Sequence, residues 1–173
     1  FDLGHVEAEL AEGRERLVQQ ADQRVAVLSE EMASERGVQI HRRYDPSLPP
    51  ILADEDRMLQ VIHNLVRNAI EAMPRGGKLT LITRLSMNPL FAKVDLGAGQ
   101  RIMAEVQVVD EGEGIPEAAR AKLFTPFFTT KERGLGLGLA LCHRILGEHR
   151  GAIQVSSEPG RATTVTCFVP TAR

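Results

Sequence analysis

A helical pattern of apolar and polar positions runs from Asp54 to Met73, and the rest of the chain can be arranged around it. One face of this segment is apolar at helical spacing. Its members are Met58, Ile62, Leu65, Val66, Ala69, Ile70 and Met73. Acidic residues open the segment, where they suit the positive end of a helix dipole, and Pro74, Gly76 and Gly77 follow it. The pattern therefore predicts one amphipathic helix.

The opposite face of this helix carries Asn64, Asn68 and Glu71. Asn is a poor helix former, so two of them four residues apart weaken the helix for no local gain. A solvated face is one interpretation. The other is a cation site, because carboxamide and carboxylate oxygens ligate hard cations and leave positions for phosphate and water.

Residues 2–36 show a charged helical pattern in two registers separated by Gly13. The first register comprises Leu3, Val6, Leu10 and Leu17, and the second comprises Val18, Ala21, Val25, Leu28 and Met32. We expect a break near Gly13, with either the tail of a coiled coil or a plain surface helix. Gly37 should end the helix. This divides the chain into residues 1–36, a helical linker or the end of a dimerisation helix, and a domain at 37–173.

Within the domain, apolar and polar residues alternate in several short runs, as they do in β-strands. Strands are predicted at Val38 to Tyr44, briefly at Ile51-Leu52, and at Lys78 to Arg84, Ile102 to Val109, Ala152 to Ser157 and Thr163 to Val169. A short helix is predicted from Pro116 to Leu123. A longer helix is predicted to begin at the glycine-rich stretch from Gly134 and to run to His149. Residues 85–100 are too irregular for an element and suggest a long connection.

Composition narrows the classes of protein. The chain has 173 residues and a net charge of −2, without a basic run or patch, so no nucleic-acid partner is expected. No apolar run approaches the ~20 residues of a membrane span, and membrane contact is not expected. Cys142 and Cys167 are isolated in apolar runs, which favours buried free thiols in a reducing compartment. Because the chain begins with Phe1, we expect it to be part of something longer.

Two glycine-containing stretches are candidates for ligand binding. Asp110-Glu111-Gly112-Glu113-Gly114 follows a strand and is either an Asp-Gly turn or a loop that approaches a flat ligand closely. Gly134-Leu135-Gly136-Leu137-Gly138 opens a helix, where free amides and the dipole favour phosphate, although tight packing also explains the glycines. Between them, Phe124, Phe127 and Phe128 form an apolar cluster.

Four motifs in order resemble the ATP-binding catalytic domain of sensor histidine kinases, over roughly residues 36–170. They are NLVRNAIEA, DEGEG, FTPFF and GLGLGLA, similar to the N box, first glycine box, F box and second glycine box. YDPSLPP and FFTTK look most like the nitrogen-regulation branch. The resemblance implies an α+β fold: a two-layer α/β sandwich of the Bergerat type. In it, a mixed, mainly antiparallel sheet has helices on one face and an ATP lid.

The resemblance also implies roles for residues, with ATP and Mg²⁺ as cofactors. Asn68 would bind Mg²⁺, with Asn64 and Glu71 in support. Asp110 would accept a hydrogen bond from the adenine amino group, while Gly112 and Gly114 leave room for the ring. Phosphate would be held by Lys131 and the stretch Gly134, Leu135, Gly136, Leu137 and Gly138. Catalysis would rest on Asn64, Asn68 and Lys131. Leu135, where Thr or Ser is common, and Ala162, where Gly is common, depart from the family pattern.

A kinase of this family also needs a phosphoacceptor histidine, and none of the five histidines has its sequence context. The implied function is transfer of the ATP γ-phosphoryl group to a histidine on a separate dimerisation domain, with a response regulator as a further partner. The expected location is cytoplasmic, in a parent protein that is either membrane-anchored or not. An ATP hydrolase, a serine-kinase anti-sigma factor or a catalytically silent nucleotide-binding module are the alternatives. The first two place a basic Glu where Asn64 stands.

Overall fold

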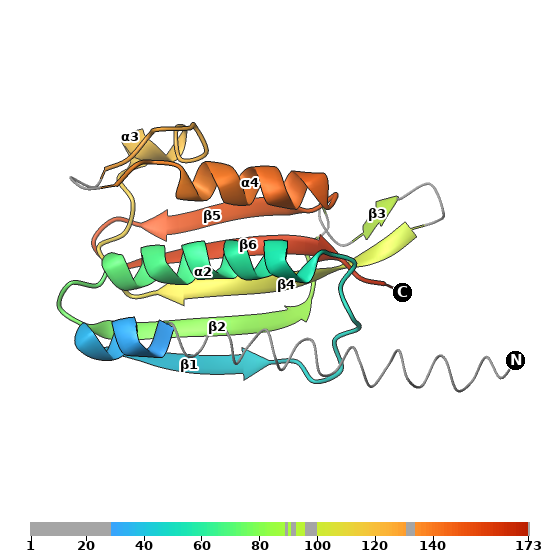
Figure 1. Cartoon of the computed structure of the whole chain (residues 1–173), viewed down its shortest axis with the longest axis horizontal. Coiled ribbons are helices and arrows are strands. Elements are labelled where there is room, and N and C mark those ends of the chain that lie inside the picture. The colour runs from blue at the N-terminus through green and yellow to red at the C-terminus, as the bar shows by residue number, and fades with distance from the viewer. Residues whose placement is uncertain (1–28, 89, 91–92, 96–99, 131–133, 173) are drawn as a thin grey trace, which may run out of the picture.

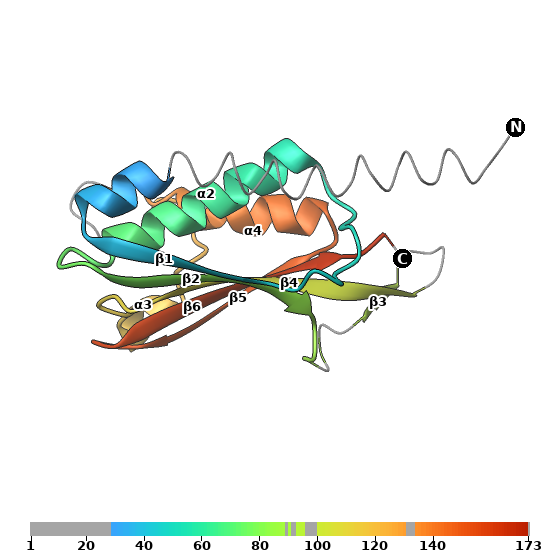
Figure 2. The same cartoon turned by 90° about the horizontal axis from the view of Figure 1, so that it is seen from below.

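The computed structural model describes residues 29–88, 90, 93–95, 100–130 and 134–172. A sheet forms one layer, and the two long helices α2 (Glu55–Glu71) and α4 (Gly138–Glu148) cover one of its faces (Figures 1 and 2). A short helix, α3 (Glu117–Arg120), lies between them in the chain. The expected two-layer α+β sandwich is therefore confirmed, whereas the two registers expected before residue 29 lie outside the described residues.

The sheet is mixed and mainly antiparallel, as the resemblance implied. Its strands are β1 (Val38–Tyr44), β2 (Gly77–Leu85), β3 (Lys93–Asp95), β4 (Gln100–Asp110), β5 (Ala152–Glu158) and β6 (Ala162–Pro170). The order is β1-β2-β4-β6-β5, with β3 paired to β4 beside this path (Figure 1). Only β1 and β2 run parallel, because the helix α2 forms the crossover between them.

The helix α2 begins and ends close to where its pattern predicts. Asp54 is the N-cap, and its carboxylate accepts a hydrogen bond from the Arg57 amide at 2.9 Å. The apolar face is buried against the sheet, where Leu79 of β2 and Val108 of β4 are fully buried. Val61, absent from the predicted apolar face, is also fully buried because α4 packs beside α2 and covers a wider stripe.

Two expectations about strands were wrong. Residues 85–100 are not wholly irregular, because β3 pairs antiparallel with β4 in this stretch. Ile51-Leu52 forms only an isolated bridge, between Ile51 and Thr171, and not a strand. Both outcomes depend on which partner strand is within hydrogen-bonding reach, and local pattern carries no information on that distance.

The domain boundary at residue 36 was an expectation that the structure leaves open. Residues 29–35 are helical, and Gly37 follows with a φ of +67°. The Gly37 amide donates to the Ser34 carbonyl at 3.1 Å, as at a helix end. Ala33 is buried in the same core as β1, so this last helical turn packs on the domain.

The N-terminal end of α2 is tied to the C-terminal end of α4 through one histidine. His149 Nε2 accepts from the Asp54 amide at 3.2 Å, and its Nδ1 lies 2.7 Å from the Ile145 carbonyl oxygen. Both contacts are satisfied together when Nδ1 carries the proton and Nε2 is the acceptor. The neutral ring thus joins the helices that border the candidate site.

Both cysteines are buried and free, as expected. Cys142 of α4 lies with its Sγ 3.8 Å from the Val61 carbonyl oxygen, and Cys167 lies on β6. Burial raises the pKa of the Cys142 thiol to about 12 and raises the pKa of Cys167 as well. These thiols therefore stay protonated and serve as small apolar groups in the core.

The α4 helix ends through a residue other than glycine. The residue with the left-handed backbone is Arg150, with a φ of 55°. Its amide donates to the Gly147 carbonyl at 3.0 Å, and the Gly151 amide donates to Leu146 at 2.8 Å. This is the hydrogen-bond pattern of a Schellman motif. Gly151 is needed instead for space, because a Cβ there would lie 2.3 Å from the Phe168 carbonyl oxygen.

Arg150→Gly should therefore stabilise the protein by about 0.5–1 kcal/mol, because glycine adopts the left-handed conformation without steric cost. For a chain of this size, thermal unfolding should shift upward by roughly 1–4 °C. Arg144→Gly is the matched control, since Arg144 lies in the interior of the same helix and is exposed. That change should destabilise, by about 1 kcal/mol. A fall in melting temperature for both variants would contradict the assigned role of Arg150.

Candidate functional site

The Asn-bearing face of α2 meets the start of α4. A Cβ built on Gly138 would lie 3.7 Å from Asn68 Nδ2 and 3.8 Å from Asn64 Oδ1. Both asparagines are half-buried. Two stretches separated by some seventy residues of sequence thus place carboxamides beside the amide-rich end of a helix. This arrangement is unlike a solvated face.

Asp110 lies at the end of β4 and faces the helices. It pairs in register with Leu79, which belongs to the core, so the two side chains project from the same face of the sheet. Asp110 is only 4% exposed, and its Oδ1 accepts from the Gly112 amide at 2.9 Å. A carboxylate offers about four acceptor positions, so further donors can bind it. The site therefore includes a buried acceptor whose orientation its own loop helps to fix.

The two glycines after Asp110 are required by contacts with the protein itself. A Cβ at Gly112 would lie 2.6 Å from the Ala72 carbonyl oxygen, at the C-cap of α2. At Gly114, which has a φ of +71°, it would lie 2.3 Å from the Glu158 carbonyl oxygen. Tight packing thus accounts for both glycines, and their proposed role in leaving room for a ring stays a prediction.

Ser157 holds the same loop from the other side, and sequence reasoning missed it. Its hydroxyl accepts from the Ile115 amide at 2.8 Å and lies 2.8 Å from the Thr163 hydroxyl. It donates to the Ala162 carbonyl at 3.0 Å, and Arg120 bonds the Ser157 carbonyl. No pattern in the sequence distinguishes this serine, because its bond to Ile115 spans 42 positions and its bonds to Ala162 and Thr163 depend on the register of β5 with β6.

A backbone hydrogen bond joins the phenylalanine stretch to the second glycine motif. The Phe127 amide donates to the Gly136 carbonyl at 3.0 Å. Phe127 has a φ of 65° and Gly136 a φ of 68°, so both adopt the left-handed region. Phe127 is 76% exposed, whereas Phe124 contacts His143 of α4 with a ring-centroid distance of 5.3 Å. Of the three phenylalanines, Phe124 is the one that fixes the stretch to α4.

Of the remaining residues predicted to bind the metal or the phosphates, all but one lie within the described part of the chain. Glu71 is half-buried near the C-terminal end of α2, with an oxygen 3.8 Å from Arg67 Nε. Gly134, Leu135 and Leu137 are exposed. Lys131 lies outside the described residues. In the part of the chain that the structure describes, no group of three His, Cys, Asp or Glu side chains could hold a metal. Among the described residues, a metal here would therefore have at most two such side chains as ligands, and carboxamide oxygen, phosphate or water would fill its other positions.

With this geometry in view, the family is clear. Residues 53–173 match the family model of histidine kinase-, DNA gyrase B-, and HSP90-like ATPases. The chain belongs to this family, and within it to the catalytic ATP-binding domains of sensor histidine kinases. In the described ranges, no helix is long and apolar enough to cross a membrane.

Among similar proteins is the sensory histidine kinase/phosphatase NtrB of Rhodobacter capsulatus, 46% identical over 118 residues. That alignment covers 68% of this chain and 33% of the relative. The sensor histidine kinase ZraS of Escherichia coli is 39% identical over 80% of this chain and 27% of its own. The chain thus spans about a third or less of these two curated relatives.

Two solved structures support the fold. The catalytic domain of the histidine kinase ThkA, in a nucleotide-free form, has a TM-score of 0.71 and 31% identity, over 88% of this chain and 91% of that domain. Full-length ShkA in complex with AMPPNP also has a TM-score of 0.71, with 29% identity, over 90% of this chain and 30% of that protein.

Gly136→Ala tests the backbone contact at the base of the lid. A Cβ there would lie 2.5 Å from the Phe127 carbonyl carbon, and the positive φ adds strain. We expect a loss of about 1–2 kcal/mol in the free energy of local opening and faster hydrogen exchange at the Phe127 amide. Gly138→Ala is the matched control, because nothing lies within 3.7 Å of its Cβ position. Equal exchange rates in the two variants would rule out this contact as the anchor.

Proposed function

We propose that this domain binds ATP with Mg²⁺ and passes the γ-phosphoryl group to a histidine on a dimerisation domain. The observation that carries the proposal is the approach of Gly138 to Asn64 and Asn68. It places oxygen ligands for a hard cation beside helix amides that suit phosphate. A cation and a polyphosphate are the two ligands that such a junction can hold together.

Asn68 is the proposed ligand of Mg²⁺, and Asn64 and Glu71 support the metal and the phosphates. Magnesium takes few protein ligands and fills its octahedron with phosphate oxygens and water. The lack of a carboxylate cluster among the described residues agrees with that mode. The metal would neutralise charge that develops on the phosphates during transfer.

Asp110 is proposed to select adenine. Its buried carboxylate can accept from an exocyclic amino group, while the Gly112 amide holds it in place at 2.9 Å. Guanine presents a carbonyl oxygen at the equivalent position, which would leave two acceptors facing each other. A site built around one donor discriminates strongly against a ligand that lacks it.

The phosphates are assigned to the start of α4 and to the residues before it. The amides around Gly136 and Gly138 point from the positive end of the helix dipole, and Lys131 would add a charge from the lid. The α4 helix has no acidic residue in its first turn, so nothing there repels an anion. Leu135 contributes no hydroxyl, which leaves phosphate recognition to backbone groups and Lys131.

Transfer to a histidine, and not hydrolysis, is favoured by Asn64. A carboxamide does not take a proton from water at neutral pH, and a positioned base typically contributes ~10²–10⁴-fold. The names of NtrB and ZraS, both sensor histidine kinases, support the same proposal. The phosphoacceptor domain, dimerisation through it and a response-regulator partner are parts of this proposal. Since the domain aligns with only part of its relatives, these roles belong to the full protein.

Asn68→Ala should weaken the binding of Mg-ATP by roughly 10- to 150-fold, which corresponds to the loss of a contact to a charged group worth about 1.5–3 kcal/mol. Binding of ATP in the presence of EDTA should change far less. Isothermal titration calorimetry measures both. Gln60→Ala is the control, because Gln60 is exposed on the same helix about two turns before Asn68. An unchanged affinity in Asn68→Ala would remove Asn68 from the metal site.

Incubated alone with labelled ATP, the chain should form no acid-labile phosphoprotein and release little phosphate, because no histidine acceptor and no base are provided. Addition of a dimerisation domain from an NtrB-type relative should produce acid-labile label on that domain. A His→Gln variant of the acceptor is the control. Strong self-labelling, or rapid phosphate release by the chain alone, would favour the serine-kinase or hydrolase alternative.

A further inference from the structure

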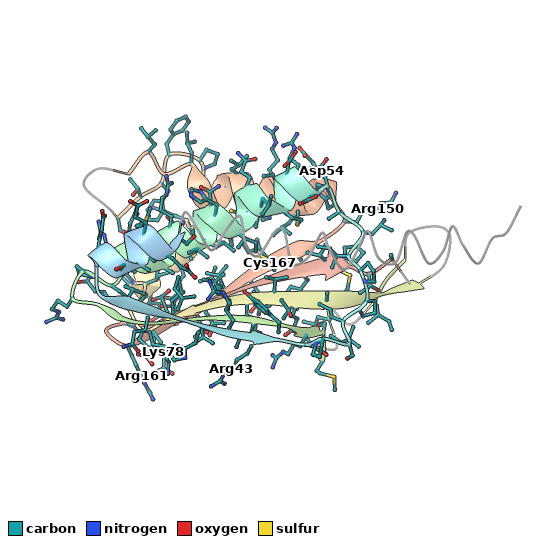
Figure 3. All side chains as sticks on the ribbon, turned by 60° about the horizontal axis from the view of Figure 1, so that its bottom comes forward. Arg43, Asp54, Lys78, Arg150, Arg161 and Cys167 are labelled. Atoms are coloured by element: carbon teal, nitrogen blue, oxygen red, sulfur yellow. The ribbon has the colours of Figure 1, made fainter. Side chains whose placement is uncertain are left out.

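The face of the sheet without helices carries a pocket of about 440 Å³. Its lining includes Arg43, Lys78, Thr80, Val109, Glu111 and Arg161. Leu79 and Leu81 of β2 belong to the core under the helices, so Lys78 and Thr80, which alternate with them along the strand, project to the other side. In Figure 3, Arg43, Lys78 and Arg161 lie together on the side of the sheet away from the helices.

Three cationic side chains from separate parts of the chain converge on this pocket. Lys78 Nζ lies 3.1 Å from a Glu111 oxygen, and Arg161 NH1 lies 3.0 Å from a Glu158 oxygen. Arg43 is exposed and forms no ion pair with another residue that the structure describes. The pairs are solvent-exposed, contribute little to stability and can rearrange around a competing anion. The three cations outnumber the two acidic residues of the lining, Asp110 and Glu111, and Arg43 is the cation without an ion pair among the described residues.

The floor of the pocket offers a hydroxyl donor. Thr80 is 7% exposed, and its hydroxyl forms no hydrogen bond with any other described residue. Among the described residues, every fully buried side-chain nitrogen or oxygen has a hydrogen-bond partner. Since the Thr80 hydroxyl has none, it is not fully buried, and it opens into the pocket that Thr80 lines. Polar groups this deep are nearly always bonded to protein, water or ligand. Thr80 thus marks a point where a bound group can accept a hydrogen bond.

We propose that this pocket binds a small anion of the phosphate type that carries two or more negative charges. Arg and Lys form short, charge-assisted hydrogen bonds to phosphate oxygens, and Thr80 adds a neutral donor between them. The volume lies within the range of small-molecule sites. Glu111 and Glu158 at the edges would repel an extended acidic protein segment, whereas a compact anion can sit between the cations.

This site is separate from the nucleotide site. Asp110 lines both regions through its position on β4, but its carboxylate faces the helices together with Leu79. The floor residues Thr80 and Val109 face the other way, and they are paired with each other across β2 and β4. A ligand on one face is therefore separated from a ligand on the other by the thickness of the sheet. The anion site stands whether or not the nucleotide proposal does.

Inorganic pyrophosphate is the probe for the test. Titrated into the chain and followed by ¹H–¹⁵N spectra, it should shift the amides of Thr80, Val109 and Ala162 along one saturable curve. Amides at Gly136 and Gly138 report any binding at the nucleotide site separately. Shifts confined to Gly136 and Gly138 would overturn the proposal.

Two variants locate the binding groups. Arg43→Gln should weaken pyrophosphate at Thr80 about five- to tenfold, through loss of one charge-assisted contact. Arg144→Gln is the control, because Arg144 is an exposed arginine of α4, on the opposite face of the sheet. It removes the same charge and should leave the affinity for pyrophosphate unchanged. Thr80→Val should weaken binding a few-fold without lowering thermal stability, since its hydroxyl has no partner among the described residues.

Three outcomes would contradict the site. Equal weakening by Arg43→Gln and Arg144→Gln would indicate diffuse attraction to net charge and no defined pocket. A large loss of stability in Thr80→Val would show that the hydroxyl has a structural role. An acidic peptide that shifts the same amides at lower concentration than pyrophosphate would assign the face to a protein partner.

Discussion

The packing of α2 on the sheet and against its neighbour α4 is the constraint on which the rest of the structure depends. One face of α2 is buried on β2 and β4, and this leaves the Asn face directed toward the start of α4. His149 joins the two helices at their other ends. Because one helix serves both the core and the site, the positions of Asn64 and Asn68 are set with the precision of core packing. A shift of α4 would change the core and the site together.

The loop after Asp110 gains its shape in the same way, from contacts with its surroundings. Gly112 lies against the C-cap of α2, and Gly114 lies against the end of β5. Ser157 closes the arrangement with three hydrogen bonds. The buried carboxylate of Asp110 is therefore held by a rigid frame, which is what a group that selects a ligand by a single hydrogen bond requires. Gly112 and Gly114 are required because another backbone segment lies too close to leave room for a Cβ atom.

The ends of β2 and β4 serve both faces of the sheet. On the helical face they carry Asp110, and on the open face they carry Lys78, Thr80 and Val109. The Glu111 amide donates to the Lys78 carbonyl at 3.3 Å, so the residue after Asp110 is bonded to the strand that supplies a cation. A ligand that displaced Glu111 from Lys78 would act on the neighbour of the proposed adenine contact. The two proposed sites are therefore adjacent in sequence at the end of β4.

Most of the secondary structure was predictable from the sequence, because it depends on local periodicity. The α2 helix, its N-cap and five of the strands follow patterns with spacings that α-helices and strands impose on any chain. The order of the motifs also indicated the family and its α+β fold. The asparagines, Asp110 and the glycine stretches were found by residue type, since few side chains suit a cation or a phosphate.

Other features were decided by tertiary structure alone. The pairing of β3 with β4 lies within an irregular stretch of sequence. The contacts of Gly114 with Glu158 and of the Ser157 hydroxyl with the Ile115 amide join residues more than forty positions apart. At the end of α4, Arg150 adopts the left-handed conformation, and Gly151 leaves room for the Phe168 carbonyl. The cationic pocket exists only because strand alternation and pairing bring Arg43, Lys78 and Arg161 to one face. The sequence by itself determined which elements form and which chemistry they carry. The distances between those elements follow from packing, which depends on the whole chain at once.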